Sequence, residues 1–115
     1  MSDDVAILLA EMQADFLDEL PQRCDSLEAS VMGLEQGERG AFDELYRQVH
    51  SLKGTGGMFG VPVITTICHQ FETFISAANQ RLDKKSASTA LAYVDLLRTT
   101  IAPAGRDAKG VADIE

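Results

Sequence analysis

The feature that most constrains this chain is an unbroken series of apolar residues spaced three or four positions apart near its start. The series consists of Leu8, Met12, Phe16, Leu20, Cys24, Leu27, Val31 and Leu34. Such spacing puts the side chains on one stripe of an α-helix, where they can face a core. Pro21 falls inside the series. Because the stripe continues on both sides of Pro21, we expect one long helix kinked at this proline, which Gly37 then ends.

Three shorter stripes of the same kind follow. The second contains Phe42, Leu45, Val49 and Leu52; the third begins at Pro62 and contains Ile64, Ile67, Cys68, Phe71, Phe74, Ile75 and Ala78; the fourth contains Leu91, Val94, Leu97 and Ile101. Ser86 is the expected cap of the last helix. Four amphipathic helices with short turns predict an all-α fold, an antiparallel up-down four-helix bundle. We expect this bundle to span residues 1–102. Pro103 should end the last helix, which would leave residues 103–115 as a mobile tail or linker.

Composition limits the function classes. A chain of 115 residues has room for one domain. The net charge of -8 argues against nucleic acid as a partner and against an anionic membrane surface. No apolar run reaches the roughly 20 residues of a membrane-spanning helix, and the acidic start lacks the basic patch of a secretory signal, so we expect a cytoplasmic protein without membrane insertion. Cys24 and Cys68 lie in apolar stripes and are expected to be buried free thiols.

The segment that carries chemistry runs from His50 to Gly60 and holds glycines at positions 54, 56, 57 and 60. Each glycine inside a helix costs about 1 kcal/mol relative to alanine, so this concentration needs a reason other than helix formation. On a helix, Tyr46, Arg47, Lys53, Gly54 and Gly57 lie around His50. A phosphoryl group on the imidazole would add roughly two negative charges, which Lys53 can offset. The glycines leave the imidazole open to another protein's active site.

The same residues carry a resemblance to a known family. His50-Ser51-Leu52-Lys53-Gly54, followed by five residues and Gly60, resembles the signature His-x-x-Lys-Gly-x5-Gly of histidine phosphotransfer domains. Residues 46–72 are similar, more narrowly, to the N-terminal phosphotransfer domain of bacterial chemotaxis histidine kinases. The features shared with that subgroup are Phe59-Gly60 and the stretch Cys68-His69-Gln70-Phe71-Glu72.

The resemblance implies a role for each matched residue. His50 is the phosphorylated residue, through Nε2, and Lys53 lies beside the phosphate. Glu72 accepts a hydrogen bond from Nδ1 of His50, which leaves the Nε2 lone pair free as the nucleophile. His69 is a second, supporting histidine near the first.

A docking surface follows from the same placement. We expect a receiver domain to lie across the second and third helices. Gly54, Gly57, Met58 and Phe59 should then lie at or near the contact.

The expected function is a phosphorelay carrier in two-component signalling, of the chemotaxis type by the narrower resemblance. A histidine kinase's ATP-binding domain phosphorylates His50, and an aspartate in a response regulator's receiver domain takes the group. The domain is then no enzyme by itself and binds no cofactor, since ATP and Mg²⁺ belong to the kinase domain. If the chain is a fragment of a histidine kinase, the rest of that kinase is needed to charge it. We expect a monomer, because no apolar stripe is left over.

Two alternatives use the same residues. The chain can be a helical module that only docks a receiver domain, in which case His50 need not react. The joint presence of Lys53, Gly54 and Glu72 around His50 favours the carrier. His50, His69 and Glu72 can also be read as zinc ligands, but Lys53 beside them would repel a divalent cation. We therefore expect no metal.

Overall fold

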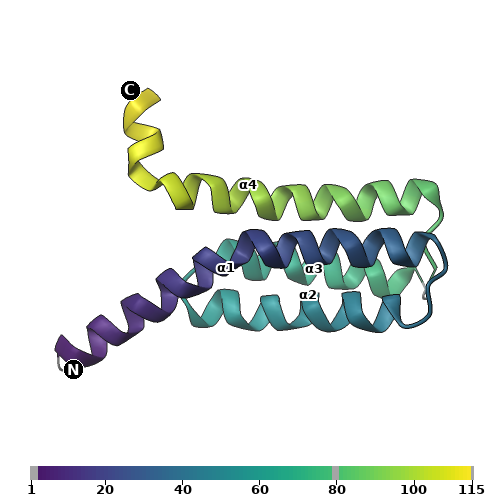
Figure 1. Cartoon of the computed structure of the whole chain (residues 1–115), viewed down its shortest axis with the longest axis horizontal. Coiled ribbons are helices and arrows are strands. Elements are labelled where there is room, and N and C mark those ends of the chain that lie inside the picture. The colour runs from purple at the N-terminus through teal and green to yellow at the C-terminus, as the bar shows by residue number, and fades with distance from the viewer. Residues whose placement is uncertain (1–2, 79–80, 115) are drawn as a thin grey trace.

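The computed structural model describes residues 3–78 and 81–114, with side chains up to residue 100. It contains four helices: α1 (Asp3–Glu35), α2 (Ala41–Met58), α3 (Pro62–Ala77) and α4 (Lys84–Ile114). Within the described ranges there is no strand. Figure 1 shows that consecutive helices run in opposite directions. The predicted all-α, antiparallel four-helix bundle is confirmed.

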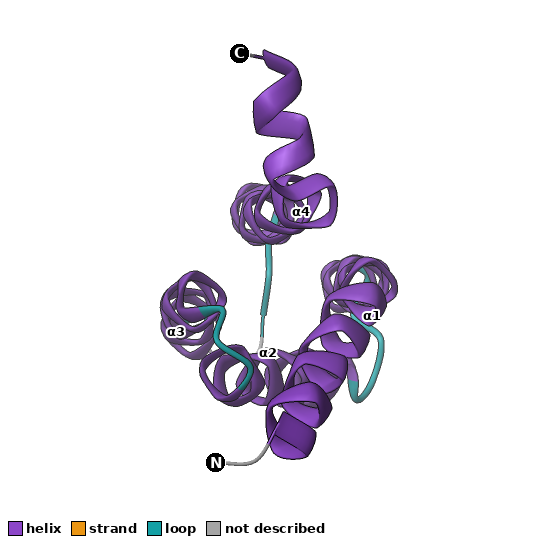
Figure 2. Cartoon of the chain, turned by 90° about the vertical axis from the view of Figure 1, so that its left-hand side faces the viewer, coloured by secondary structure: helices purple, strands orange, loops and turns teal. Residues whose placement is uncertain are grey.

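Each helix packs against two others. The packed pairs are α1 with α2, α2 with α3, α3 with α4, and α4 with α1; among the described residues no two Cα atoms come within 8 Å across either diagonal. The end-on view in Figure 2 shows this arrangement. Neighbours in the chain are thus neighbours in space, as short turns require.

The core contains residues of all four predicted stripes, and Phe42, Ile67, Phe74, Ala78 and Leu91 are only partly buried against it. Its fully or almost fully buried members include Leu20, Cys24, Leu27, Val31, Leu45, Val49, Leu52, Ile64, Cys68, Phe71, Ile75, Val94 and Leu97. Both cysteines are free and buried. Burial in this apolar environment raises the pKa of Cys68 to about 12, and it also raises the pKa of Cys24. The two thiols are therefore packing residues with little nucleophilic character.

Two glycines with left-handed backbone end the first two helices. Gly37 follows α1 with φ +81°, and Gly60 follows α2 with φ +78°. Each forms the paired hydrogen bonds of a Schellman motif: Gly37 N–H to Leu34 O with Glu38 N–H to Gly33 O, and the equivalent pair after α2. Gly60 therefore ends α2.

The start of α4 differs from the sequence expectation. Asp83, rather than Ser86, caps the helix: its Oδ1 accepts a hydrogen bond of 2.7 Å from the Ser86 backbone N–H. The helix begins at Lys84, two residues before Ser86, the expected cap. A carboxylate one position before the first helical residue is well placed to satisfy a free N–H of the first turn.

The first turns of α1 depart from the expected core. Pro21 lies within one continuous helix, as predicted, and Figure 1 shows α1 changing direction partway along. Its N-terminal part extends past the end of the bundle, so Leu8 and Met12 are 54% and 40% exposed. The expectation that they face the core is wrong, and so is the premise that no apolar stripe is left over.

The last helix also continues further than predicted. α4 does not end before position 103 but runs to Ile114, and Figure 1 shows it turning away from the bundle at its yellow end. A proline inside a helix removes one hydrogen bond and bends the axis, and here the helix resumes beyond it. The expected core position Ile101 lies outside the described side chains. The division into a bundle of residues 1–102 and a linker of 103–115 stays a prediction.

None of the described helices combines the length and the apolar character that crossing a bilayer requires.

Candidate functional site

The predicted site forms on the outer surface between α2 and α3. His50 and Lys53 lie one turn apart on α2, and Glu72 lies on α3 opposite them. The exposed fraction falls from 62% for the His50 side chain to 26% for Lys53 and 12% for Glu72. The imidazole is therefore accessible to a large partner, whereas the carboxylate lies underneath it.

Glu72 binds both α2 residues with its two oxygens. Its Oε2 lies 2.6 Å from Nδ1 of His50, and its Oε1 accepts a hydrogen bond of 2.7 Å from Nζ of Lys53. The sequence led us to expect the first contact. The contact between Lys53 and Glu72 was not indicated, because the resemblance implies only that Lys53 lies beside a bound phosphate.

The Lys53 contact determines the ionisation of Glu72. Hydrogen bonds from the Lys53 ammonium and then from His50 lower the pKa of the Glu72 carboxyl below its ordinary value. An ionised carboxylate can only accept hydrogen bonds. The hydrogen between Glu72 and His50 must therefore be carried by Nδ1, which fixes the tautomer of the neutral imidazole.

With the proton on Nδ1, the second ring nitrogen of His50 holds a free lone pair. Among the described residues, Nε2 has no hydrogen-bond partner. A lone pair on an exposed, oriented imidazole is a nucleophile for an electrophile brought by another molecule. The geometry thus separates an orienting side of the ring from a reactive side.

Tyr46 adds a flat surface beside the imidazole. Its ring lies four residues before His50 on α2, nearly parallel to the imidazole at 7°, with the ring centroids 6.2 Å apart. Phe42 stacks on Tyr46 in the same way one turn earlier. The sequence placed Tyr46 near His50 but indicated no role for it, although the spacing of four residues was the signal for this contact.

The glycines of the motif serve different purposes. A Cβ added at Gly54 would meet no atom within 4 Å, so this surface is open, as expected. At Gly57 a Cβ would lie 3.3 Å from Oγ1 of Thr65, which is tight. At Gly56 it would lie only 2.9 Å from Cγ2 of the buried Ile64. Gly56 is therefore needed for the close approach of α3 to α2.

The two remaining expected docking residues lie in different environments. Met58 is 72% exposed at the end of α2. Phe59 is half-buried: its ring packs on Phe16 with centroids 5.3 Å apart, and its carbonyl accepts a hydrogen bond of 2.7 Å from Gln13. Phe59 thus ties α1 to the α2–α3 turn, a role that the sequence did not indicate.

His69 does not join the central contact. It lies three residues before Glu72 on α3 and is exposed, and within the described part of the chain its side chain makes no hydrogen bond or ion pair. The described residues also contain no group of three His, Cys, Asp or Glu side chains arranged to hold a metal ion. The Lys53 ammonium on Glu72 gives a physical reason why this cluster does not suit a cation.

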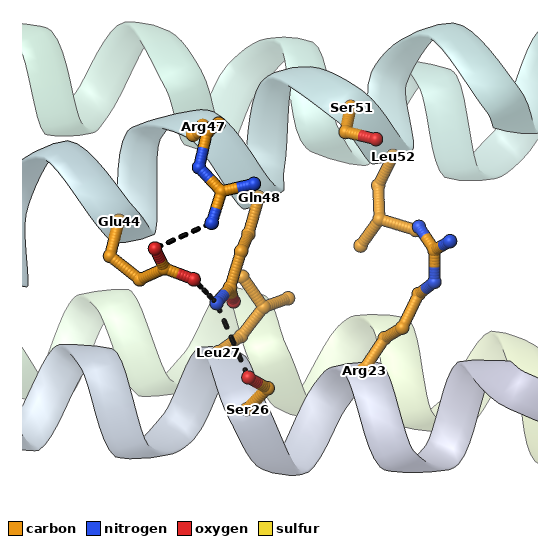
Figure 3. A pocket seen from close by; sticks show the side chains of 8 residues that line it. All are labelled: Arg23, Ser26, Leu27, Glu44, Arg47, Gln48, Ser51 and Leu52. Atoms are coloured by element: carbon orange, nitrogen blue, oxygen red, sulfur yellow. Dashed lines mark hydrogen bonds and ion pairs between the residues drawn. The ribbon is translucent and has the colours of Figure 1, made fainter.

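A separate hollow lies between α1 and α2 (Figure 3). Its lining consists of Arg23, Ser26, Leu27, Glu44, Arg47, Gln48, Ser51 and Leu52. Glu44 accepts hydrogen bonds from Arg47 and from Gln48, which also donates to Ser26. Of these contacts only the hydrogen bond from Gln48 to Ser26 joins α1 and α2, and Oε1 of Gln48 is buried without a hydrogen-bond partner among the described residues.

Comparisons with known proteins find a family and two curated relatives. The profile of the Hpt domain family matches residues 11–102. The chain is also similar to two curated proteins named "Chemotaxis protein CheA", from Treponema pallidum (strain Nichols) at 31% identity and from Rhizobium meliloti (strain 1021) at 29%. Each match covers 88% of this chain but only 12% and 14% of those proteins. The search of solved structures gives no significant match.

The low pKa of Glu72 predicts how pH affects stability. A carboxyl group whose pKa is lower in the folded than in the unfolded chain stabilises the fold above its unfolded pKa, and this contribution is lost as pH falls through the folded value. The ordinary value is 4.5. We expect Glu72→Gln to have a lower free energy of unfolding than the parent at roughly pH 5, and the difference to shrink below roughly pH 4. Urea unfolding followed by circular dichroism measures it; a difference that persists unchanged to pH 3 would contradict the ionised bridge.

The two glycine environments predict opposite effects of the same substitution. Gly54→Ala should raise the free energy of unfolding by about 0.5–1 kcal/mol, since the added Cβ meets nothing and alanine favours the helix. Gly56→Ala should lower it by about 1–2 kcal/mol, because overpacking against Ile64 outweighs that gain. Chemical denaturation of both variants tests the pair. Equal effects would mean that α2 and α3 do not approach as closely as described.

Proposed function

Since the chain belongs to the Hpt domain family, which supplies phosphotransfer carriers in two-component signalling, we propose that it carries the phosphoryl group on Nε2 of His50. A histidine kinase's ATP-binding domain donates the group, and an aspartate in a response regulator's receiver domain accepts it. The observation that carries this proposal is the Glu72 carboxylate, which binds Nδ1 of His50 and Nζ of Lys53 together. It leaves Nε2 as the reactive atom of an exposed ring.

The two transfer steps use His50 in opposite senses. In the first, the Nε2 lone pair attacks the γ-phosphorus of ATP held by the kinase domain; the N–P bond forms as the P–O bond to ADP breaks. In the second, an aspartate oxygen of the receiver attacks the same phosphorus, and the electron pair of the N–P bond returns to the imidazole. Throughout, Glu72 accepts the Nδ1 hydrogen and stabilises the positive charge that develops on the ring. ATP and Mg²⁺ are supplied by the kinase domain.

Lys53 has a place in the same scheme. An ammonium group has three donors, so Nζ can keep its bond to Glu72 and still donate to an oxygen of a phosphoryl group on His50. Its position one turn after His50 on α2 supports this second contact. Lys53 would then act twice, by keeping Glu72 ionised and by offsetting part of the phosphoryl charge.

The exposed surface around His50 is the proposed contact with both protein partners. Gly54 and Gly57 present bare backbone beside the imidazole, and Met58 offers an apolar side chain at the end of α2. Phe59 supports this surface from below through its packing on Phe16. His69, exposed on α3, lies at the edge of the same surface and is proposed only as a supporting contact.

A place in chemotaxis is the finer part of the proposal. It rests on the two relatives named "Chemotaxis protein CheA" and on the subgroup features Phe59-Gly60 and His69. The chain spans about an eighth of the length of those proteins. By itself the chain is proposed to be a carrier, which has to meet an ATP-binding domain in the same protein or in another.

Phosphorylation of His50 is directly testable. After incubation with ATP, Mg²⁺ and the ATP-binding module of a chemotaxis kinase, we expect a mass increase of one phosphoryl group that is lost in acid and stable in alkali. His50→Gln should take up none, whereas His69→Gln, the matched control, should still take up one phosphoryl group. Label persisting in His50→Gln would mean that another residue reacts. No label with several kinases, in a folded protein, would favour the module that only docks.

A further inference from the structure

Thr65 connects the two helices of the site at a point that the transfer chemistry does not use. It lies in the first turn of α3, and its hydroxyl donates a hydrogen bond of 2.7 Å to the backbone carbonyl of Lys53 on α2. The other six threonine hydroxyls, such as that of Thr66 on the Pro62 carbonyl, bind carbonyls of their own helix. The Thr65 hydroxyl therefore joins α3 to α2, whereas the other threonine hydroxyls bind within one helix.

The glycines of α2 provide the space for this contact. Cβ atoms at Gly56 and Gly57 would lie 3.1 Å and 3.3 Å from Oγ1 of Thr65. Side chains at these positions would push the hydroxyl away from the Lys53 carbonyl. The motif glycines and Thr65 thus form one close junction between α2 and α3.

This junction lies on the same face of α3 as the contact of Glu72 with His50 and Lys53. Glu72 comes seven residues after Thr65, which is about two helical turns and about 10.5 Å along the same face of α3. Lys53 takes part in both contacts: its backbone carbonyl accepts a hydrogen bond from Thr65, and its ammonium group donates one to Glu72. Hydrogen bonds of this type weaken beyond about 3.2 Å. A slip of α3 along α2 by a fraction of a turn would therefore separate Glu72 from His50.

We propose that Thr65 is a positioning residue of the phosphotransfer site: its hydroxyl, seated over Gly56 and Gly57 on the Lys53 carbonyl, fixes the register at which Glu72 reaches Nδ1 of His50. This inference rests on the proposed function for its effect on rate, but its effect on the imidazole exists whether or not His50 is phosphorylated. Thr65 acts through Glu72 and touches no reacting atom.

The test compares three variants. Thr65→Val keeps the shape of the side chain and removes the hydroxyl, Thr65→Ser keeps the hydroxyl, and Thr66→Val removes a hydroxyl that binds only its own helix. The first readout is the ¹⁵N NMR spectrum of the His50 imidazole, which reports the fraction of the tautomer with its proton on Nδ1. The second is the rate of phosphorylation by a kinase's ATP-binding module.

We expect Thr65→Val to lower the Nδ1–H fraction and to slow phosphorylation roughly fivefold, the factor that one net hydrogen bond represents. Thr65→Ser and Thr66→Val should match the parent in both measurements. If Thr65→Val lowers only the global stability and leaves the His50 nitrogen signals unchanged, Thr65 is a packing residue and the inference is wrong. Because the spectrum needs no phosphate, a parent that is never phosphorylated would overturn the proposed function without deciding the role of Thr65.

A further comparison guards against loss of folding in Thr65→Val. In a Glu72→Ala background the contact that Thr65 is proposed to position no longer exists. Adding Thr65→Ala to that background should change the phosphorylation rate less than adding the same substitution to the parent does. Equal changes in both backgrounds would show that Thr65 does not act through Glu72.

Discussion

A carboxylate shared between an imidazole and an ammonium group holds this site together. Glu72 is the least exposed of the three side chains, and its two oxygens bind His50 and Lys53 at 2.6 Å and 2.7 Å. A carboxylate under a reactive ring is useful only while it is ionised, because the protonated form could donate to Nδ1 and leave the wrong tautomer. The Lys53 ammonium keeps the Glu72 pKa low and so maintains the acceptor. The reactivity of Nε2 therefore depends on Lys53, although Lys53 need not contact that atom.

The bundle makes this contact possible because α2 and α3 approach closely. Gly56 lies against Ile64, and the buried faces of both helices meet in a common core. Gly54, Gly56 and Gly57 lie inside a helix of 18 residues and are costly for helix formation, and Gly60 follows its end. Their roles divide between close packing at Gly56, ending the helix at Gly60 and an open surface at Gly54. Stability is thus reduced locally at the segment that a partner has to reach.

The four helices and the grouping of His50 with Lys53 on one face of α2 could be predicted from the sequence, because both depend on local spacing. Apolar stripes fix which face of each helix is buried, and the motif around His50 places Lys53 one turn away. Among the contacts between helices, the one between Glu72 and His50 was expected from the family resemblance, and spacing alone does not indicate any of them. Nothing in the spacing of Lys53 and Glu72, 19 residues apart, indicates that they bind each other. The hydroxyl of Thr65 on the Lys53 carbonyl likewise depends on the register of two helices.

The errors at the ends of the helices have a similar cause. Leu8 continues the stripe of α1, but periodicity does not show where the neighbouring helices stop, so its exposure beyond the bundle was missed. Asp83 and Ser86 are both suitable caps, and the choice between them depends on where α4 meets the core. The proline at position 103 was read as a stop, whereas a helix can resume after a bend.

The central claim is that Glu72 orients His50 so that Nε2 carries the phosphoryl group. The most direct measurement is ¹⁵N and ³¹P NMR of the phosphorylated protein, which identifies the nitrogen bonded to phosphorus. We expect phosphorus on Nε2 of His50, with a hydrogen on Nδ1 that is bonded to Glu72. Phosphorus on Nδ1 of His50, or on either nitrogen of His69, would contradict the claim.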